Sequence, residues 1–245
     1  MKIKIASAIL ILALCTSVTL FAEERPWTNS TELSFVNTSG NTEVITLSAK
    51  DKLTYRFSPK IETWLQLAVL YGESDGIKNS EHYSAKLNGS YLISDKFYTS
   101  AIIGWSKDEF AGIDSKIWAG PALGYKILTL TKHNLDFEAG IEYVDEKFTD
   151  PPAGGSNSYC NGRALTAYRF RISKKNDFSE SLEFNYDFEE SDNYKINSIT
   201  SVTTVLSDIL SLRASYEIDY ANSPPPTGGL EKTDTTLSIS LIVNI

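Results

Sequence analysis

Apolar and polar residues alternate along almost the whole chain after about residue 28. Residues 81–93, EHYSAKLNGSYLI, show the pattern clearly: the odd positions are mostly apolar and the even positions mostly polar. Successive side chains of a β-strand point to opposite faces, so a period of two residues predicts a strand with one apolar and one polar face. No segment shows a convincing helical period, and we therefore predict an all-β fold.

The alternation divides into twelve segments separated by turn residues. Their approximate ranges are 28–38, 42–56, 60–72, 81–93, 97–107, 115–127, 134–147, 162–173, 178–189, 194–206, 209–221 and 232–245. The links between segments also alternate. Short links lie at 58–60, 94–96, 174–177 and 207–208, and longer ones at 73–80, 107–114, 148–161, 189–193 and 222–229. Two links depart from this rule: 39–41 is short for its class and about 128–133 is long.

An even number of strands with short turns on one side and longer loops on the other is typical of a transmembrane antiparallel β-barrel of the outer membrane. The segments also have the 9–11 residues that a tilted membrane strand needs. Phe178 and Phe188 stand near the two ends of one apolar face, as aromatic girdles require. We therefore predict about 12 strands in up-and-down topology, with both termini periplasmic, the apolar set facing lipid and the polar set lining a lumen.

The alternative is a soluble periplasmic β-barrel that binds a ligand, with the apolar set inside. Such a barrel would normally have about eight strands and would not need girdles.

The N-terminus has the features of a secretory signal peptide. Lys2 and Lys4 precede an apolar run over 5–14, and small residues lead to Ala22. We predict a signal peptide over 1–22 and a barrel over 23–245. Export to the bacterial outer membrane would then involve the barrel insertion machinery and outer-membrane lipid.

Composition narrows the function classes. The formal net charge is −8 and becomes more negative when Lys2 and Lys4 are removed, which argues against nucleic acid as a partner. Cys160 is the only cysteine after the predicted leader, so no intrachain disulfide is possible, and we interpret it as an incidental loop thiol. We see no zinc spacing or nucleotide fingerprint and expect no metal and no cofactor. Acidic loops such as 189–192 are interpreted as solvated.

Several short stretches, in order along the chain, resemble the YdiY-like family of salt-induced outer membrane proteins, which is largely of unknown function. They are Trp27 followed by TSGNT (38–42), WSKDEFAGIDSK (105–116), GPALGY (120–125), EAGIEY (138–143) and NSPPPTGGLEKTD (222–234). The resemblance implies a monomeric outer-membrane barrel with no assigned substrate. It also implies a role in envelope integrity under osmotic stress, which nothing in the residues themselves indicates.

Charged residues recur at polar positions of three consecutive segments. They form a predicted lumen charge ladder of Asp136, Glu138, Glu142, Arg163, Arg169, Arg171, Glu183, Asp187 and Glu189. If the hairpin closes at 174–177, Arg169 lies opposite Glu183 and Arg163 opposite Glu189. The ladder would either stiffen a filled interior or select small solutes by charge at a constriction. Twelve strands lie between the filled eight-stranded and the open 16–18-stranded barrels, and we favour a filled or nearly filled interior.

His82 and Ser84 form an H-x-S pair, which resembles the His/Ser pair of outer-membrane lipid hydrolases. Their parity places them on the polar face, away from lipid, and we identify no third orienting residue. We therefore interpret the pair as part of the lumen lining and the protein as not an enzyme. The expected function is a structural or stress-related envelope barrel or a small-solute pore.

Overall fold

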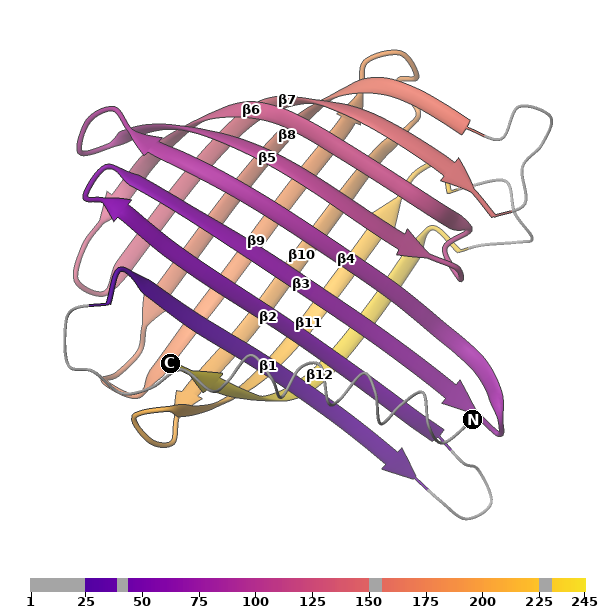
Figure 1. Ribbon diagram of the computed structural model, residues 1–245, viewed down its shortest axis with the longest axis horizontal. Helices are drawn as coiled ribbons and strands as arrows, with labels where there is room; N and C mark the ends of the chain where they lie inside the picture. The colour runs from indigo at the N-terminus through magenta and orange to yellow at the C-terminus, as the bar shows by residue number, and fades with distance from the viewer. Residues whose placement is uncertain (1–24, 39–43, 150–155, 225–230) are drawn as a thin grey trace.

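A computed structural model describes residues 25–38, 44–149, 156–224 and 231–245 (Figure 1). The predicted signal peptide lies outside the described residues. The described chain forms one closed barrel of twelve antiparallel strands, each paired with its sequence neighbours and β1 with β12, which confirms the predicted fold class. The strands are β1 (Trp27–Thr38), β2 (Val44–Ser58), β3 (Ile61–Ser74), β4 (Ile77–Leu92), β5 (Phe97–Asp108), β6 (Ile113–Thr129), β7 (His133–Phe148), β8 (Ser156–Arg171), β9 (Asn176–Asp187), β10 (Tyr194–Val205), β11 (Leu210–Ala221) and β12 (Thr233–Asn244).

The two ends of the barrel differ. We call the end with the β2–β3, β4–β5, β6–β7, β8–β9 and β10–β11 connections the turn end, and the opposite end the loop end. Turns at the turn end commonly start with a serine whose Oγ accepts backbone N–H groups two or three residues later. Ser58, Ser94, Ser173 and Ser207 all do so. Such serine turns reverse the chain within a few residues.

Some strands reach further toward the loop end than predicted. The link 73–80 is not a long loop, because β3 and β4 are joined by Asp75 and Gly76 alone, with φ of 51° and 78°. Two positive φ angles are those of a type I′ hairpin turn, which suits Asp-Gly. Likewise β8 begins at Ser156, so Cys160 is an exposed strand residue and not a loop thiol. In these strand ends the backbone hydrogen bonds of the sheet continue, but apolar and polar residues no longer alternate. A prediction based on alternation therefore ends the strands too early.

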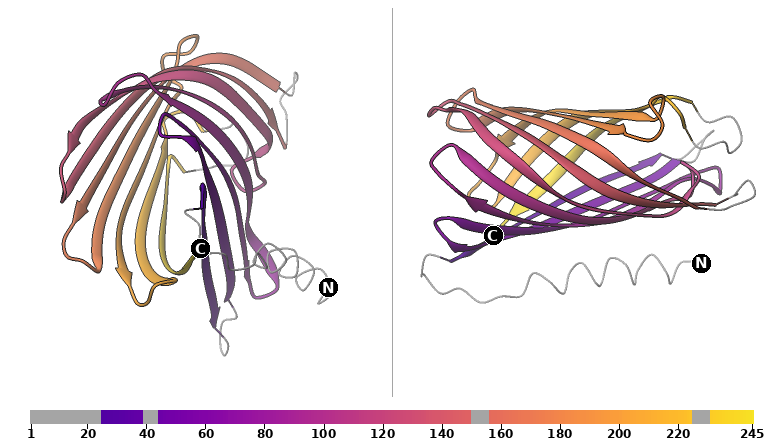
Figure 2. Two further views of the ribbon diagram at one scale, coloured as in Figure 1. Left: turned by 60° about the vertical axis from the view of Figure 1, so that its left-hand side comes forward. Right: turned by 90° about the horizontal axis from the view of Figure 1, so that it is seen from above.

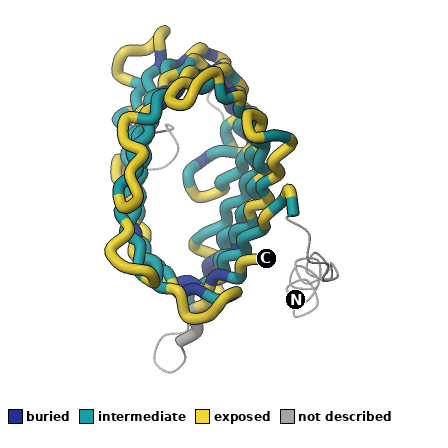
Figure 3. Tube along the Cα trace, turned by 90° about the vertical axis from the view of Figure 1, so that its left-hand side faces the viewer, coloured by how far each residue is buried: buried dark blue, intermediate teal, exposed yellow. Residues whose placement is uncertain are grey.

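The barrel is apolar outside and polar inside. Among exposed residues are many large apolar side chains, such as Leu87, Ile103 and Leu237, the last 77% exposed. Among buried residues are Glu138, Glu142 and Asp187, the last only 2% exposed. Figure 3 shows buried positions spread around the ring of strands, with no single central core. This arrangement is the reverse of a soluble ligand-binding barrel, which must place its apolar set inside.

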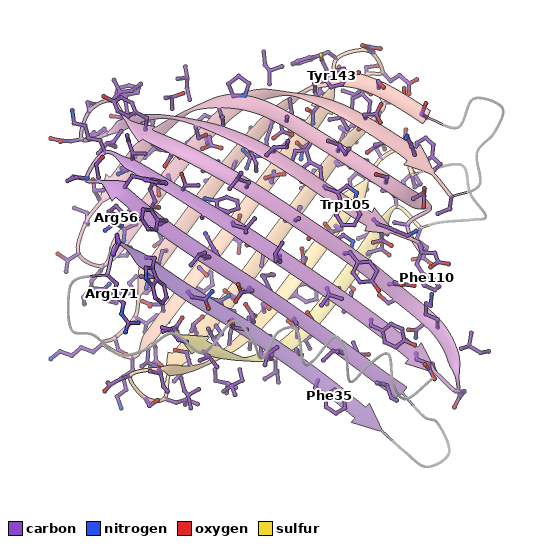
Figure 4. The ribbon with its side chains drawn as sticks, in the orientation of Figure 1. Phe35, Arg56, Trp105, Phe110, Tyr143 and Arg171 are labelled. Carbon is purple, nitrogen blue, oxygen red and sulfur yellow. The ribbon has the colours of Figure 1, made fainter. Side chains whose placement is uncertain are left out.

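Aromatic side chains gather near both ends of the barrel. At the turn end they include the contacting pairs Tyr55–Phe57 and Phe97–Tyr125. At the loop end they include Phe184–Tyr194 and Tyr194–Tyr220. Figure 4 shows Arg56 and Arg171 at the turn end, and Trp105 and Tyr143 toward the other end. Two aromatic bands that flank an apolar belt are a property of transmembrane barrels.

The outward set of side chains includes the carboxylates of Asp51 and Glu180. Asp51 on β2 accepts hydrogen bonds from the Nδ2 of Asn29, at 3.1 Å, and from the Oγ1 of Thr31, at 2.6 Å. Glu180 on β9 accepts hydrogen bonds from the hydroxyls of Ser198 and Thr200. Neighbouring strands thus supply donors for both carboxylates, which lowers the cost of placing them outside the lumen.

The closing seam between β1 and β12 is short. Only four residue pairs, from Ser30–Asn244 to Leu33–Leu241, join the two strands, compared with eleven between β10 and β11. Reciprocal backbone hydrogen bonds between Asn29 and Ile245, both 2.9 Å, extend the seam to the turn end. Beyond this paired part the two strands diverge toward the loop end (Figure 1). Figure 2 shows the C-terminus beside β1 in two further views.

The arrangement predicts opposite responses to a charge on the two faces of β4. Leu87 points outward between Leu65 and Ile103, midway between Tyr83 and Tyr91. Leu87→Arg should lower the free energy of unfolding in lipid vesicles by about 2–4 kcal/mol, the cost of arginine at a bilayer midplane. The matched control, Ser84→Arg, places the same group in the lumen and should cost far less. Denaturant titrations followed by tryptophan fluorescence measure both, and equal losses would contradict the assigned orientation.

Candidate functional site: the charged lumen

The interior encloses a cavity of about 2250 Å³, lined by inward residues of all twelve strands. The expectation of a filled or nearly filled interior is therefore wrong. Two large inward aromatic side chains, those of Trp118 and Tyr98, lie against the wall over glycines of a neighbouring strand. The ring of Trp118 on β6 covers Gly104 on β5, where a Cβ atom would come within 2.2 Å of the ring. The ring of Tyr98 covers Gly124 in the same way, at 1.9 Å. Glycine on one strand thus leaves room for a ring from its neighbour.

Arg163 on β8 is the centre of the largest buried ion cluster. Its side chain is 9% exposed and binds carboxylates of both neighbouring strands. On β7, Nη1 lies 2.6 Å from Glu138 Oε1 and Nε lies 3.6 Å from Glu142 Oε1. On β9, Nη2 lies 2.8 Å from Glu183 Oε2. One guanidinium therefore serves three carboxylates from two strands, and the cluster retains a negative excess.

Further hydrogen bonds hold the carboxylates in place. Ser100 on β5 donates to Glu138 Oε2 at 2.9 Å, and Asn185 donates to Glu183 Oε1 at 3.0 Å. Glu142 Oε1 is buried and accepts no hydrogen bond from the described residues, so its main stabilisation is the charge of Arg163. A buried charge without its partner is costly. The cluster therefore depends on Arg163 more than on any single carboxylate.

The pairing of β8 with β9 is shifted by four residues from the predicted register. Arg163 lies opposite Asn185 and Arg169 opposite Ser179, so the predicted pairs Arg163–Glu189 and Arg169–Glu183 are wrong. The turn starts at Ser173, whose Oγ accepts the N–H groups of Lys175 and Asn176, and not at Lys174. Serine also starts the turns of other hairpins at this end, and this recurrence in the sequence would have predicted the correct start of the turn.

The other predicted ladder residues have separate surroundings. Arg169 and Arg171 lie near the turn end, where both approach Asp177 and are about half exposed. Asp136 lines the lumen. Asp187 ends β9 and accepts hydrogen bonds from the backbone N–H groups of Glu189 and Glu190, so it caps a turn. Glu189 lies exposed in that turn.

A second buried cluster was not predicted. Glu146 Oε1 lies 2.8 Å from the Nζ of Lys116 and 3.1 Å from that of Lys195, so it connects β7 with β6 and β10. Glu146 has the same parity as Glu138 and Glu142, and this repeat of four residues could have indicated it.

The lumen charges are separated across the barrel. Strands β2 to β6 contribute mainly bases to the cavity wall: Lys50, Lys52, Arg56, Lys86, Lys116 and Lys126, with Glu62 and Asp108 as acids. Strands β7 to β12 contribute mainly acids: Asp136, Glu138, Glu142, Glu183, Asp187, Glu217, Asp219 and Asp234, with Arg163, Lys195 and Arg213 as bases. A basic wall facing an acidic wall creates an electric field across the lumen.

His82 has a partner that the sequence did not reveal. His82 lies opposite Asp108 of β5, and its Nδ1 is 3.1 Å from Asp108 Oδ2. Ser84 also lines the cavity, but within the described chain it forms no hydrogen bond with His82. An activated serine requires that contact, and the described side chain of His82 is instead directed to Asp108. Among the described residues no group of three or more His, Cys, Asp or Glu side chains could hold a metal ion.

The barrel is similar in fold to solved outer-membrane proteins. A Pseudomonas putida F1 outer membrane channel matches with a TM-score of 0.56 at 11% identity, covering 91% of this chain and 97% of that chain. The NanC porin matches with a TM-score of 0.50 at 7% identity, covering 89% and 97%. The translocator domain of the autotransporter NalP from Neisseria meningitidis matches with a TM-score of 0.50 at 10% identity, covering 99% and 97%. No curated protein matches the sequence. A family model described as "Protein of unknown function, DUF481" matches residues 31–245.

The central position of Arg163 generates a stability prediction. Arg163→Gln leaves three carboxylates without their shared cation and should lower the free energy of unfolding by about 3–5 kcal/mol. Arg169→Gln is the matched control: its side chain is 54% exposed and forms its ion pair with a single described residue, Asp177, so the loss should stay below about 1 kcal/mol. Adding Glu138→Gln and Glu183→Gln to the first variant should recover part of the loss. Denaturant titration in lipid vesicles measures all three, and similar losses for Arg163→Gln and Arg169→Gln would refute the assignment.

Proposed function

The chain belongs to the DUF481 family of proteins of unknown function, and we propose that it is an outer-membrane pore for small polar solutes. The observation that carries this proposal is the cavity of about 2250 Å³ whose wall is built from all twelve strands. A barrel with only a structural role would gain packing by filling that space with side chains.

The surface of the barrel supports a location in the outer membrane. The apolar belt with aromatic bands suits lipid, and the predicted leader suits export. Outer-membrane barrels have their short turns and both termini on the periplasmic side. We therefore assign the turn end, where β1 begins and β12 ends, to the periplasm. Lipid and the barrel insertion machinery are the partners that such a location requires.

The separation of charge suggests which solutes pass. Bases on one wall and acids on the other nearly balance, so the lumen has little reason to prefer cations over anions. A transverse field instead orients dipolar solutes, with an anionic group toward β2–β6 and a cationic group toward β7–β12. We therefore assign small zwitterionic or polar neutral solutes as the preferred class.

The alternative function is a structural barrel that supports the envelope under osmotic stress, as the resemblance to salt-induced proteins implies. Planar lipid bilayers separate the two hypotheses. Folded protein should produce discrete current steps with weak ion selectivity if it is a pore. Folded protein that inserts without any current steps would favour the structural role.

The flat packing of Trp118 generates a prediction about pore width. Gly104→Val places atoms where the Trp118 ring lies, so the ring should turn from the wall into the lumen and reduce single-channel conductance. The matched control is Gly89→Val, since Gly89 is on the outer face of β4 and a Cβ there meets nothing closer than Thr63 Oγ1, at 3.8 Å. That control should conduct normally. Unchanged conductance in Gly104→Val would show that the ring does not border the conducting path.

A further inference from the structure

The seam between β1 and β12 leaves both strand edges unpaired over its loop-end part. Within the part of the chain that the structure describes, residues 34–38 of β1 and 233–240 of β12 have no partner across the seam. If the register that pairs Leu33 with Leu241 continued, Ser34 would lie opposite Ser240 and Phe35 opposite Ile239. Instead, the strands diverge from this point (Figure 1).

An ion pair marks the point where the seam opens. Arg213 of β11 reaches past β12 to Glu32 of β1, with 2.8 Å between Nη1 and Oε2. Thr203 of β10 holds the same guanidinium by accepting a hydrogen bond from Nε at 3.0 Å. Glu32 belongs to the last two paired residues of β1. The ion pair thus fastens β1 to β11 from inside the lumen, and beyond it the described residues of β1 and β12 are not paired.

The lumen cavity continues into this opening. Its wall includes the inward residues Ser34, Ser238 and Ser240 of the two edges. The same wall includes Phe35, Leu237 and Ile239, which belong to the outward set and are strongly exposed. One continuous surface therefore leads from the polar lumen, between β1 and β12, to the apolar exterior.

Membrane energetics restrict what can occupy the opening. An unpaired backbone N–H or C=O group in contact with hydrocarbon costs several kcal/mol, so lipid tails alone cannot cover both edges. Water from the lumen can satisfy these groups while apolar side chains face the membrane. A molecule with one polar and one apolar end would find a suitable surface for each.

The charged residues of the lumen near the opening indicate which charge the polar end of such a molecule would have. Asp219 of β11 lies directly opposite Asp234 of β12, and Glu217 precedes Asp219 by two residues in β11. Asn197 donates hydrogen bonds to Glu217 and Asp219. None of these three carboxylates takes part in an ion pair within the described chain. Like charges placed opposite each other on neighbouring strands repel, and a cation would relieve that repulsion.

From these observations we propose that the unpaired part of the β1–β12 seam is a lateral entrance to the lumen for a single-chain amphiphile with a cationic head. The apolar chain lies along Phe35, Leu237 and Ile239, and the head reaches the carboxylates of Glu217, Asp219 and Asp234. This route joins the membrane to the lumen and is additional to axial passage of polar solutes, so it requires only the membrane location from the proposed function.

A quenching experiment tests the entrance without measuring current. In a Cys160→Ser background, a fluorophore is attached to Ser238→Cys, on the lumen face of the open edge. The matched control carries it at Ser201→Cys, on the lumen face of β10, which pairs fully on both sides. Both proteins are placed in vesicles that contain a nitroxide-labelled, single-chain quaternary ammonium amphiphile. Folding of each is checked by the mobility shift of an unheated barrel on a denaturing gel.

The lateral entrance predicts several-fold stronger quenching at position 238 than at 201, because the amphiphile reaches the lumen beside β12. Quenching at 238 should fall when a sulfate head replaces the ammonium, and Asp219→Asn with Asp234→Asn should remove this preference. Equal quenching at 238 and 201 would overturn the entrance. Quenching at 238 that ignores the head charge would overturn the cationic occupant. Failure of the pore alone would appear separately, as a folded protein without current but with the quenching pattern intact.

Discussion

Every strand of this protein depends on one constraint: backbone groups in a membrane must find their hydrogen bonds within the protein. A closed antiparallel ladder meets that requirement, and closure frees the side chains to invert the usual distribution, with apolar groups outward and charges inside. The aromatic bands, the satisfied carboxylates of Asp51 and Glu180 and the polar lumen all follow from this geometry. The seam of β1 and β12 is where the constraint is met least completely, and it is also where the lumen approaches the exterior.

The charged residues of the lumen fall into two groups, those in buried ion clusters and those that line the cavity. Some ions are held in tight groups around Arg163 and Glu146, which connect strands that are not all direct neighbours. Others, such as Asp136 on the acidic wall, line open space. The grouped charges stiffen the wall, while glycines opposite Trp118 and Tyr98 keep large rings out of the centre. Stability and open space are thus provided by different residues of the same strands.

Much of this architecture could be predicted from the alternation alone, since a period of two assigns each residue to a face independently of its partners. The parity of Arg163, Glu138 and Glu183 was enough to bring them together in the lumen. Parity alone could not predict which residues lie opposite one another, because the register depends on where the turn begins. The turn between β8 and β9 begins at Ser173, one residue before the predicted position. The partners of His82 and Glu146 depend on which strands lie side by side and on how far side chains reach. The unpaired seam escapes sequence analysis entirely, since nothing in the alternation of β1 or β12 distinguishes a paired edge from an open one.

The hydrogen bonds between Asn29 and Ile245 also have a consequence for assembly. Neighbouring hairpins can form from local contacts, but the two strands that close the ring are the most distant in the chain, and such contacts form late. Until they meet, both edges remain available to other strands. Closure of this ring therefore waits for the meeting of its first and last strands.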